Sequence, residues 1–91
     1  MKCYLILYDL RSSDRNYSSL TEAIKSYGTW AKITENSWAI VTDHSAVDIR
    51  NNLTQFIDSE DRLFVIKSGS HAAWKNVLGK TDWFKKYLKL T

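Results

Sequence analysis

Proline is absent from this chain of 91 residues, and glycine occurs at only three positions, 28, 69 and 79. No linker rich in these residues can therefore be recognised. The glycines are also too far apart to form a loop that cradles a phosphate group. Because a chain of this length forms one domain with one modest hydrophobic core, we expect a single folded unit.

Cysteine is nearly absent too, since Cys3 is the only one and no disulfide can form within the chain. Its position in an apolar run is typical of a small buried hydrophobe in a reducing compartment, which predicts a cytoplasmic protein. The apolar run ends at Asp9, before it reaches the length of a signal peptide or a membrane span. We therefore expect neither secretion nor a membrane-spanning segment.

Motifs for metal clusters and for nucleophilic catalysis are missing as well. His44 and His71 have no cysteine, histidine or acidic residue at a recognised ligand spacing. No serine, cysteine or threonine lies in a nucleophile motif. The sequence therefore gives no support to a histidine-based metal site or to a covalent hydrolase.

Positive charge is concentrated near the C-terminus. Residues 1–66 hold seven Lys and Arg against nine Asp and Glu, a net charge of −2, whereas residues 67–91 hold six lysines and one aspartate, a net charge of +5. Such a tail can meet phosphate, an anionic membrane surface or an acidic partner, or it can only keep a terminal helix soluble.

Alternating apolar residues predict strands, and apolar residues three or four positions apart predict helices. The motif SLTE, Ser19–Glu22, resembles a capping box, and Ser45 and Thr81 are expected to cap two further helices. The predicted strands cover residues 2–9, 29–34, 37–42 and 62–67, and the predicted helices run from Ser19 to Gly28, from Ser45 to about Asp58 and from Thr81 onward.

The order strand, helix, strand, strand, helix, strand is that of the ferredoxin-like split βαβ pattern, βαββαβ. We predict an α+β fold in which residues 1–68 form an antiparallel sheet with both helices on one face. Residues 69–91 are expected to form a C-terminal extension with a basic amphipathic helix, packed on its own protomer or on a partner.

Two helices cover only one face of such a sheet, and alternation makes the other face apolar as well. The residues expected beneath the helices are Cys3, Leu5, Leu7, Ala31, Ala39 and either Leu63 or Val65. The residues expected on the uncovered face are Tyr4, Ile6, Tyr8, Trp30, Trp38, Ile40, Phe64 and Ile66. An apolar patch of this size on a small protein needs a cover.

Three covers fit that face: a second copy of the protein, the chain's own C-terminal tail, or the bases of a nucleic acid. A homodimer packed sheet against sheet uses large aromatic residues well. Base stacking calls for basic residues among the aromatic ones, and only Lys32 meets that need. We predict a homodimer whose interface contains Tyr4, Ile6, Tyr8, Trp30, Trp38 and Phe64.

The first predicted strand ends on a carboxylate, Asp9, which a strand does not need for its own structure. One explanation is that Asp9 accepts hydrogen bonds from backbone amides and bends the connection to the first helix, as aspartates in turns do. The other is that Asp9 takes part in chemistry.

Three stretches resemble a known family. They are YLILYDL, in which Asp9 closes the first strand, AIKSYGTW, in which Tyr27 and Gly28 end the first helix, and LTQFIDSEDRLFVIKSG, with an acidic turn before the fourth strand. Together they resemble the small CRISPR-associated endonuclease of the spacer-integration complex and the related virulence-associated protein D. The resemblance covers about residues 2–69.

This resemblance implies a metal-dependent endonuclease that acts on RNA or DNA. In that family two ferredoxin-like protomers pair through their sheets, and the aspartate ending the first strand of each binds a divalent metal at the two-fold axis. It implies that Asp9 is the catalytic residue and the metal ligand, with Mg²⁺ as the cofactor. One carboxylate per chain is too few for Mg²⁺, whereas two symmetry-related copies suffice. Arg11, Arg15 and Lys32 are candidate phosphate contacts.

A non-catalytic protein is the alternative hypothesis. It would be a homodimeric interaction or regulatory module that works through its dimer face and its basic tail. The two hypotheses differ in the role of Asp9, which is chemical in the first and structural in the second.

Overall fold

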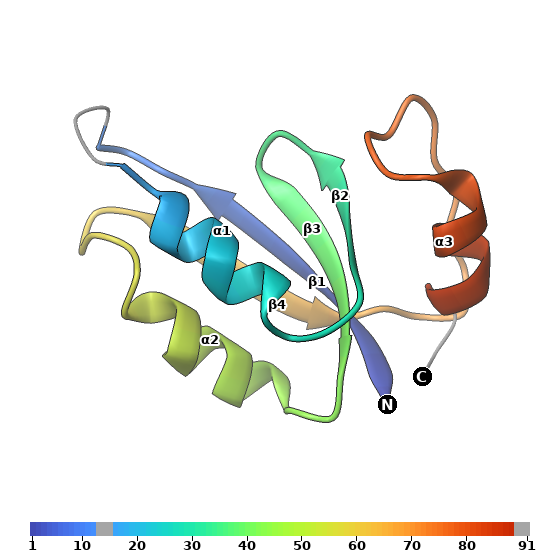
Figure 1. Cartoon of the computed structure of the whole chain (residues 1–91), viewed down its shortest axis with the longest axis horizontal. Coiled ribbons are helices and arrows are strands. Elements are labelled where there is room, and N and C mark those ends of the chain that lie inside the picture. Colours follow the sequence, from blue (N-terminus) through green and yellow to red (C-terminus); the bar gives the residue numbers. More distant parts are fainter. Residues whose placement is uncertain (13–15, 89–91) are drawn as a thin grey trace.

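The computed structural model describes residues 1–12 and 16–88 of the chain. The helices α1 (Ser18–Lys25) and α2 (Ala46–Thr54) lie side by side on one face of the sheet, and α3 (Thr81–Tyr87) lies on the other side (Figure 1). The elements are β1 (Lys2–Asp9), α1 (Ser18–Lys25), β2 (Trp30–Thr34), β3 (Ser37–Thr42), α2 (Ala46–Thr54), β4 (Arg62–Lys67) and α3 (Thr81–Tyr87).

The strand order in the sheet is β2-β3-β1-β4, and every neighbouring pair is antiparallel. This confirms an α+β fold with a four-stranded antiparallel sheet, consistent with the predicted ferredoxin-like arrangement. β1 is one of the two central strands, so its last residue, Asp9, lies in the middle of one edge of the sheet, where the strands end. Within the described residues, no helix is long and apolar enough to cross a membrane.

The first hydrophobic core lies between the sheet and the helices α1 and α2. In each helix, two aliphatic residues four positions apart point to the same side. These residues are Leu20, Ile24, Ile49 and Leu53, and none is more than 1% exposed. Burying one such side chain stabilises the fold by about 1.5–3 kcal/mol, so these four residues anchor both helices.

The sequence prediction assigns the two faces of β1, β2 and β3 the wrong way round. Tyr4, Ile6 and Trp38 lie beneath α1 and α2, where they are 6%, 0% and 2% exposed. The same face holds Tyr8, Trp30 and Ile40. A dimer interface over the three buried residues is therefore wrong, whereas Phe64 does lie on the opposite face and is exposed.

Side-chain volume explains this reversal. The two short helices contribute leucine and isoleucine, so the strands have to fill the remaining space with large residues. On the other face the C-terminal segment supplies large aromatic side chains, among them Phe84 and Trp83. Small strand residues such as Cys3 and Ala39 complement them. Cys3 is fully buried, as expected, and burial raises the pKa of its thiol.

The helix starts agree only in part with the predicted caps. The Ser45 side chain caps α2 by accepting a hydrogen bond from the backbone N–H of Asp48 at 3.1 Å. The predicted capping box is wrong, because α1 begins at Ser18 and the Asn16 side chain accepts from the Ser18 N–H at 2.9 Å. Asn16, two residues upstream, thus satisfies the first backbone N–H of the helix. Thr81, predicted as the cap of the last helix, is instead the first residue of α3, and the residue at the cap position, Lys80, makes no side-chain capping hydrogen bond.

The C-terminal segment packs on the chain's own sheet and covers part of its second face. The Leu78 N–H donates to the carbonyl of Ile33 at 3.0 Å, and Trp83 Nε1 donates to Thr29 Oγ1 at 2.9 Å. A Cβ atom at Gly79 would lie 3.0 Å from the ring of Phe84 and 3.0 Å from the carbonyl oxygen of Lys32, so this close approach favours glycine. The segment is thereby held against the edge strand β2.

Candidate functional site at the end of strand β1

Asp9 is the last residue of β1 and pairs in register with Arg62, the first residue of β4. Its Oδ2 atom accepts a hydrogen bond from Arg62 Nη1 at 2.6 Å and lies 3.4 Å from Arg11 Nη1. The Asp9 side chain is about half exposed, at 52%. One carboxylate thus lies between two guanidinium groups at the surface.

The two arginines change the acidity of Asp9. The hydrogen bond from Arg62 is the largest cause and lowers the pKa of the Asp9 carboxyl; desolvation, the second-largest cause, opposes it, and the contact with Arg11 lowers the pKa further. Asp9 is therefore ionised at neutral pH. The Asp9 carboxylate can bind a hard cation, and the two guanidinium groups beside it can bind a phosphate group.

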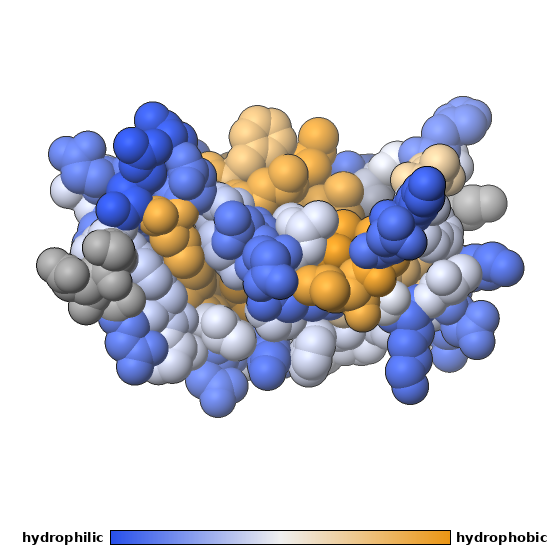
Figure 2. All heavy atoms as spheres, turned by 90° about the horizontal axis from the view of Figure 1, so that it is seen from above, coloured by the Kyte–Doolittle hydropathy of each residue, from blue (hydrophilic) through white to orange (hydrophobic). Residues whose placement is uncertain are grey.

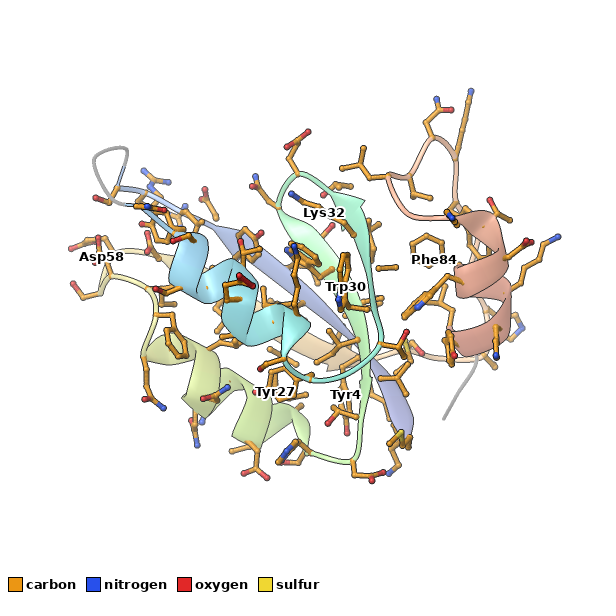
Figure 3. The ribbon with its side chains drawn as sticks, in the orientation of Figure 1. Tyr4, Tyr27, Trp30, Lys32, Asp58 and Phe84 are labelled. Carbon is orange, nitrogen blue, oxygen red and sulfur yellow. The ribbon has the colours of Figure 1, made fainter. Side chains whose placement is uncertain are left out.

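An acidic turn between α2 and β4 holds the loop that carries Arg11. Asp61 Oδ1 accepts from the backbone N–H of Arg11 at 2.6 Å, while its Oδ2 accepts from the Tyr17 hydroxyl and from the Asp58 N–H, both at 2.8 Å. Figure 3 places Asp58 at this end of the molecule. Asp61 therefore connects the β1–α1 loop, helix α1 and the turn before β4.

An apolar surface adjoins Asp9 on the face opposite to α1 and α2. The C-terminal segment leaves Leu7, Phe64 and Ile66 uncovered, and they are 43%, 61% and 46% exposed. An open hollow of about 320 Å³ beside them is lined by Leu7, Tyr8, Asp9, Arg62, Leu63 and Phe64. Figure 2 shows hydrophobic side chains at the surface in the middle of the molecule, between hydrophilic ends. We call Leu7, Phe64 and Ile66 the β1–β4 patch.

The predicted site residues do not all come together. Asp9 and Arg11 are in contact, as a shared site requires. Lys32 lies on the helix-covered face of β2, with its ammonium group 5.1 Å from the centre of the Trp38 ring, and so belongs to a different surface. Arg15 lies outside the described residues.

Arg62 and Asp61 also belong to this site, although the sequence did not predict them. Arg62 could have been found from the antiparallel pairing of β1 with β4, because the last residue of one strand then faces the first residue of the other. Asp61 could not, since its role depends on how a turn meets a loop 50 residues away.

Metal ligands are few within one chain. Among residues 1–12 and 16–88, no group of three or more His, Cys, Asp and Glu side chains is placed to hold a metal ion. Among the residues that the structure describes, Asp9 is the only carboxylate lining the hollow beside the β1–β4 patch. A Mg²⁺ ion accepts one or two carboxylates if water fills its other positions.

Replacing Arg62 by alanine is expected to raise the pKa of Asp9, and Arg11→Ala is expected to raise it less. The ion pair stabilises the fold above the pKa of an aspartate in the unfolded chain, about 3.9, and this contribution is lost as the pH falls through the lower folded-state pKa. The measurement is a carbon-13 NMR titration of the Asp9 carboxyl. An unchanged pKa in Arg62→Ala would show that Arg62 does not hold Asp9 in solution.

Replacing Asp61 by alanine is expected to destabilise the fold by about 2 kcal/mol, because three hydrogen bonds to one carboxylate are lost together. Urea unfolding of the variant measures the change. The neighbouring exposed residue Glu60 serves as the control, and Glu60→Ala should stay within about 0.5 kcal/mol of the wild type. Equal stabilities of the two variants would contradict the proposed connecting role of Asp61.

Comparison with known proteins adds a fold relationship. No family model matches the chain. The chain is similar to the crystal structure of a hypothetical protein, TT1823, from Thermus thermophilus, with a TM-score of 0.64 and 19% sequence identity. The match covers 84% of this chain and 92% of that one. At this identity the likeness shows the fold alone.

Proposed function

We propose that this protein is a homodimeric, metal-dependent endonuclease of the ferredoxin-like fold that acts on nucleic-acid phosphodiesters at the end of β1. The observation that carries the proposal is the position of Asp9, an ionised and half-exposed carboxylate on a central strand, between Arg11 and Arg62. A strand end of this kind presents oxygen and guanidinium groups together, and phosphodiester hydrolysis uses both.

The donor atoms at this position fit Mg²⁺ if two chains contribute. Asp9 supplies hard oxygen ligands, which Mg²⁺ prefers, and its low pKa keeps them deprotonated at neutral pH. A second Asp9 from a partner would complete a pair of carboxylates. When bound, the ion would polarise the phosphoryl group and activate water.

The two arginines have a role in the same proposal. Arg11 and Arg62 now contact the Asp9 carboxylate, and a guanidinium group binds a phosphate in the same forked geometry. We expect them to hold the phosphate backbone of the substrate near Asp9. Their charge also compensates part of the negative charge that two aspartates and a phosphodiester bring together.

The β1–β4 patch supplies the surface for the partner. Leu7 and Phe64 adjoin Asp9 and Arg62 around one hollow, so a second copy seated there brings its own Asp9 to the same region. A two-fold contact is self-complementary, and a patch centred on an aromatic residue is typical of such interfaces. This replaces the aromatic face that the sequence predicted as the dimer contact.

The experiment that tests the proposal compares the wild type with Asp9→Asn in cleavage of RNA, single-stranded DNA and duplex DNA, with Mg²⁺ or Mn²⁺ and with EDTA. Metal-dependent cleavage that is lost in Asp9→Asn supports it. Absence of cleavage by the wild type on all three substrates would contradict it.

A second candidate is the non-catalytic homodimer. The observation in its favour is that Arg62 and Arg11 already satisfy the charge of Asp9, as in an ion pair that only ties β1 to β4. Under this hypothesis no cleavage exists, and Asp9→Asn changes only the link between the strands. The β1–β4 patch would still hold the second copy.

A further inference from the structure

Two tryptophans and two lysines form a separate surface on the helix-covered side of the sheet, away from Asp9. Trp30 and Trp38 meet edge to face, with ring centres 5.4 Å apart. The Lys25 ammonium lies 4.9 Å from the ring centre of Trp30, and the Lys32 ammonium lies 5.1 Å from that of Trp38. We call these four residues the Trp30 platform. Figure 3 shows Trp30 and Lys32 close together on β2.

The platform combines an accessible aromatic ring with uncompensated positive charge. Trp38 is buried, but Trp30 is 39% exposed. The exposed part of the Trp30 ring can therefore contact a ligand. Within the described residues, neither Lys25 nor Lys32 is within 4.0 Å of a carboxylate oxygen, since the ion pairs found there involve other cations.

We propose that the Trp30 platform binds single-stranded nucleic acid, with one unpaired base stacked on Trp30 and neighbouring phosphates held by Lys25 and Lys32. Proteins that bind single strands combine aromatic rings, which stack on bases, with basic side chains that follow the backbone. Only an unpaired base exposes its face to such a ring, so duplexes are excluded from the stacking contact. RNA and DNA share these groups, and the experiment below compares the two.

Stacking on Trp30 has to displace Lys25 from the ring. A cation–π contact at an exposed site is worth about 2- to 5-fold in an equilibrium, whereas stacking of one base on an aromatic side chain is worth about 5- to 100-fold in affinity. The displaced ammonium group also remains close enough to meet a phosphate. The bound arrangement is therefore favoured over the contact in the free protein.

This surface goes beyond the proposed function and does not depend on it. Trp30 and Lys32 pair in register with Ile40 and Trp38, which places them on the face covered by α1 and α2. Asp9 follows Leu7 by two residues on β1, so its side chain leaves the opposite face. Variants of the platform can thus be tested without changing a side chain of the β1 site.

The test is fluorescence anisotropy of labelled oligonucleotides of about ten nucleotides, as single-stranded RNA, single-stranded DNA and duplex DNA, in EDTA at salt concentrations from about 50 to 200 mM. Full-length wild-type protein is expected to bind at least one kind of single strand about 10-fold or more tightly than the duplex. Equal or tighter binding of the duplex, or no binding of either single strand, would overturn the proposal.

Three variants separate the contributions of the platform. Trp30→Ala should weaken binding by about 5- to 100-fold with an unchanged salt slope, and Trp30→Phe should keep most of the affinity because phenylalanine still stacks. Lys25→Gln with Lys32→Gln should make the slope of log K against log salt less steep by about 1.4, or about 0.7 for each phosphate contact. Circular dichroism confirms that each variant is folded.

A matched control removes the same charge from α3. Lys85 and Lys86 are exposed lysines, and Lys86 also lies over an aromatic ring, 5.2 Å from the centre of Tyr87. Lys85→Gln with Lys86→Gln should leave affinity and slope close to the wild type. If this control makes the slope of log K against log salt less steep by as much as the platform variant does, the nucleic acid binds to the basic tail and the proposal is wrong.

Comparison with Asp9→Asn keeps the two proposals distinguishable. Loss of cleavage in Asp9→Asn, together with binding by that variant that still weakens on Trp30→Ala, supports both. If the protein binds single strands through Trp30 but cleaves no substrate, the proposed binding at the Trp30 platform is supported and the proposed endonuclease activity is refuted. Cleavage that depends on Asp9 while Trp30→Ala and Trp30→Phe bind like the wild type would refute the platform alone.

Discussion

Replacing Asp9 by asparagine is expected to lower metal-dependent cleavage of nucleic acid by roughly 100-fold or more while the chain remains folded. Asparagine has nearly the same shape and keeps one oxygen that can accept a hydrogen bond from Arg62. It lacks the charge that a hard cation needs from its ligand. The side chain is half exposed, so its ion pairs are screened by solvent and contribute little to stability.

The matched control for this variant is Asp43→Asn. Asp43 is also exposed and also ion-paired, with its Oδ1 atom 3.2 Å from the N-terminal amino group, but it follows β3, close to Lys2 at the opposite end of the sheet. Cleavage by Asp43→Asn should equal that of the wild type. If both variants lose activity equally, the effect is one of overall charge. If Asp9→Asn keeps full activity, Asp9 is not the metal ligand.

The order of the strands and helices could be predicted because it depends on local sequence patterns, namely the spacing of apolar residues and the residues that cap helices. Ser45 illustrates this well, since its side chain caps α2 through a bond to a residue three positions away. Asp9 at the end of β1 is another such case, because the change from apolar to charged residues marks the strand end directly. Both features depend on neighbours in the sequence.

The choice of sheet face could not be predicted, because it depends on volumes that different segments bring together. Trp38 and Ala39 are adjacent and point to opposite faces, and alternation alone does not say which face lies under the helices. The choice of face depends on Phe84, which follows Ala39 by 45 residues, because its ring fills the space over the small strand residues. For the same reason Lys25, on α1, could not be assigned to the Trp30 platform from the sequence.

Replacing Phe64 by arginine is expected to weaken the proposed homodimer by roughly 100-fold or more. Phe64 is the most exposed member of the β1–β4 patch, at 61%, so the folded monomer should tolerate the change. In a dimer the same side chain would be desolvated, and arginine would bring an unpaired charge into an apolar contact. Sedimentation equilibrium over a range of protein concentrations measures the dissociation constant. Val47→Arg is the control, since Val47 is 55% exposed and lies on α2, which packs on the other face of the sheet.

If two copies of Asp9 share one metal site, cleavage activity should be proportional to the concentration of dimer. At low protein concentration the activity of Phe64→Arg should then fall with the square of the concentration, because only the dimer is active, and it should recover as the concentration rises. Val47→Arg should match the wild type in both assays. A wild-type protein that sediments as a monomer, or a Phe64→Arg variant that dimerises and cleaves normally, would contradict the β1–β4 patch as the dimer contact. Activity of a purely monomeric variant would further show that one Asp9 per site suffices.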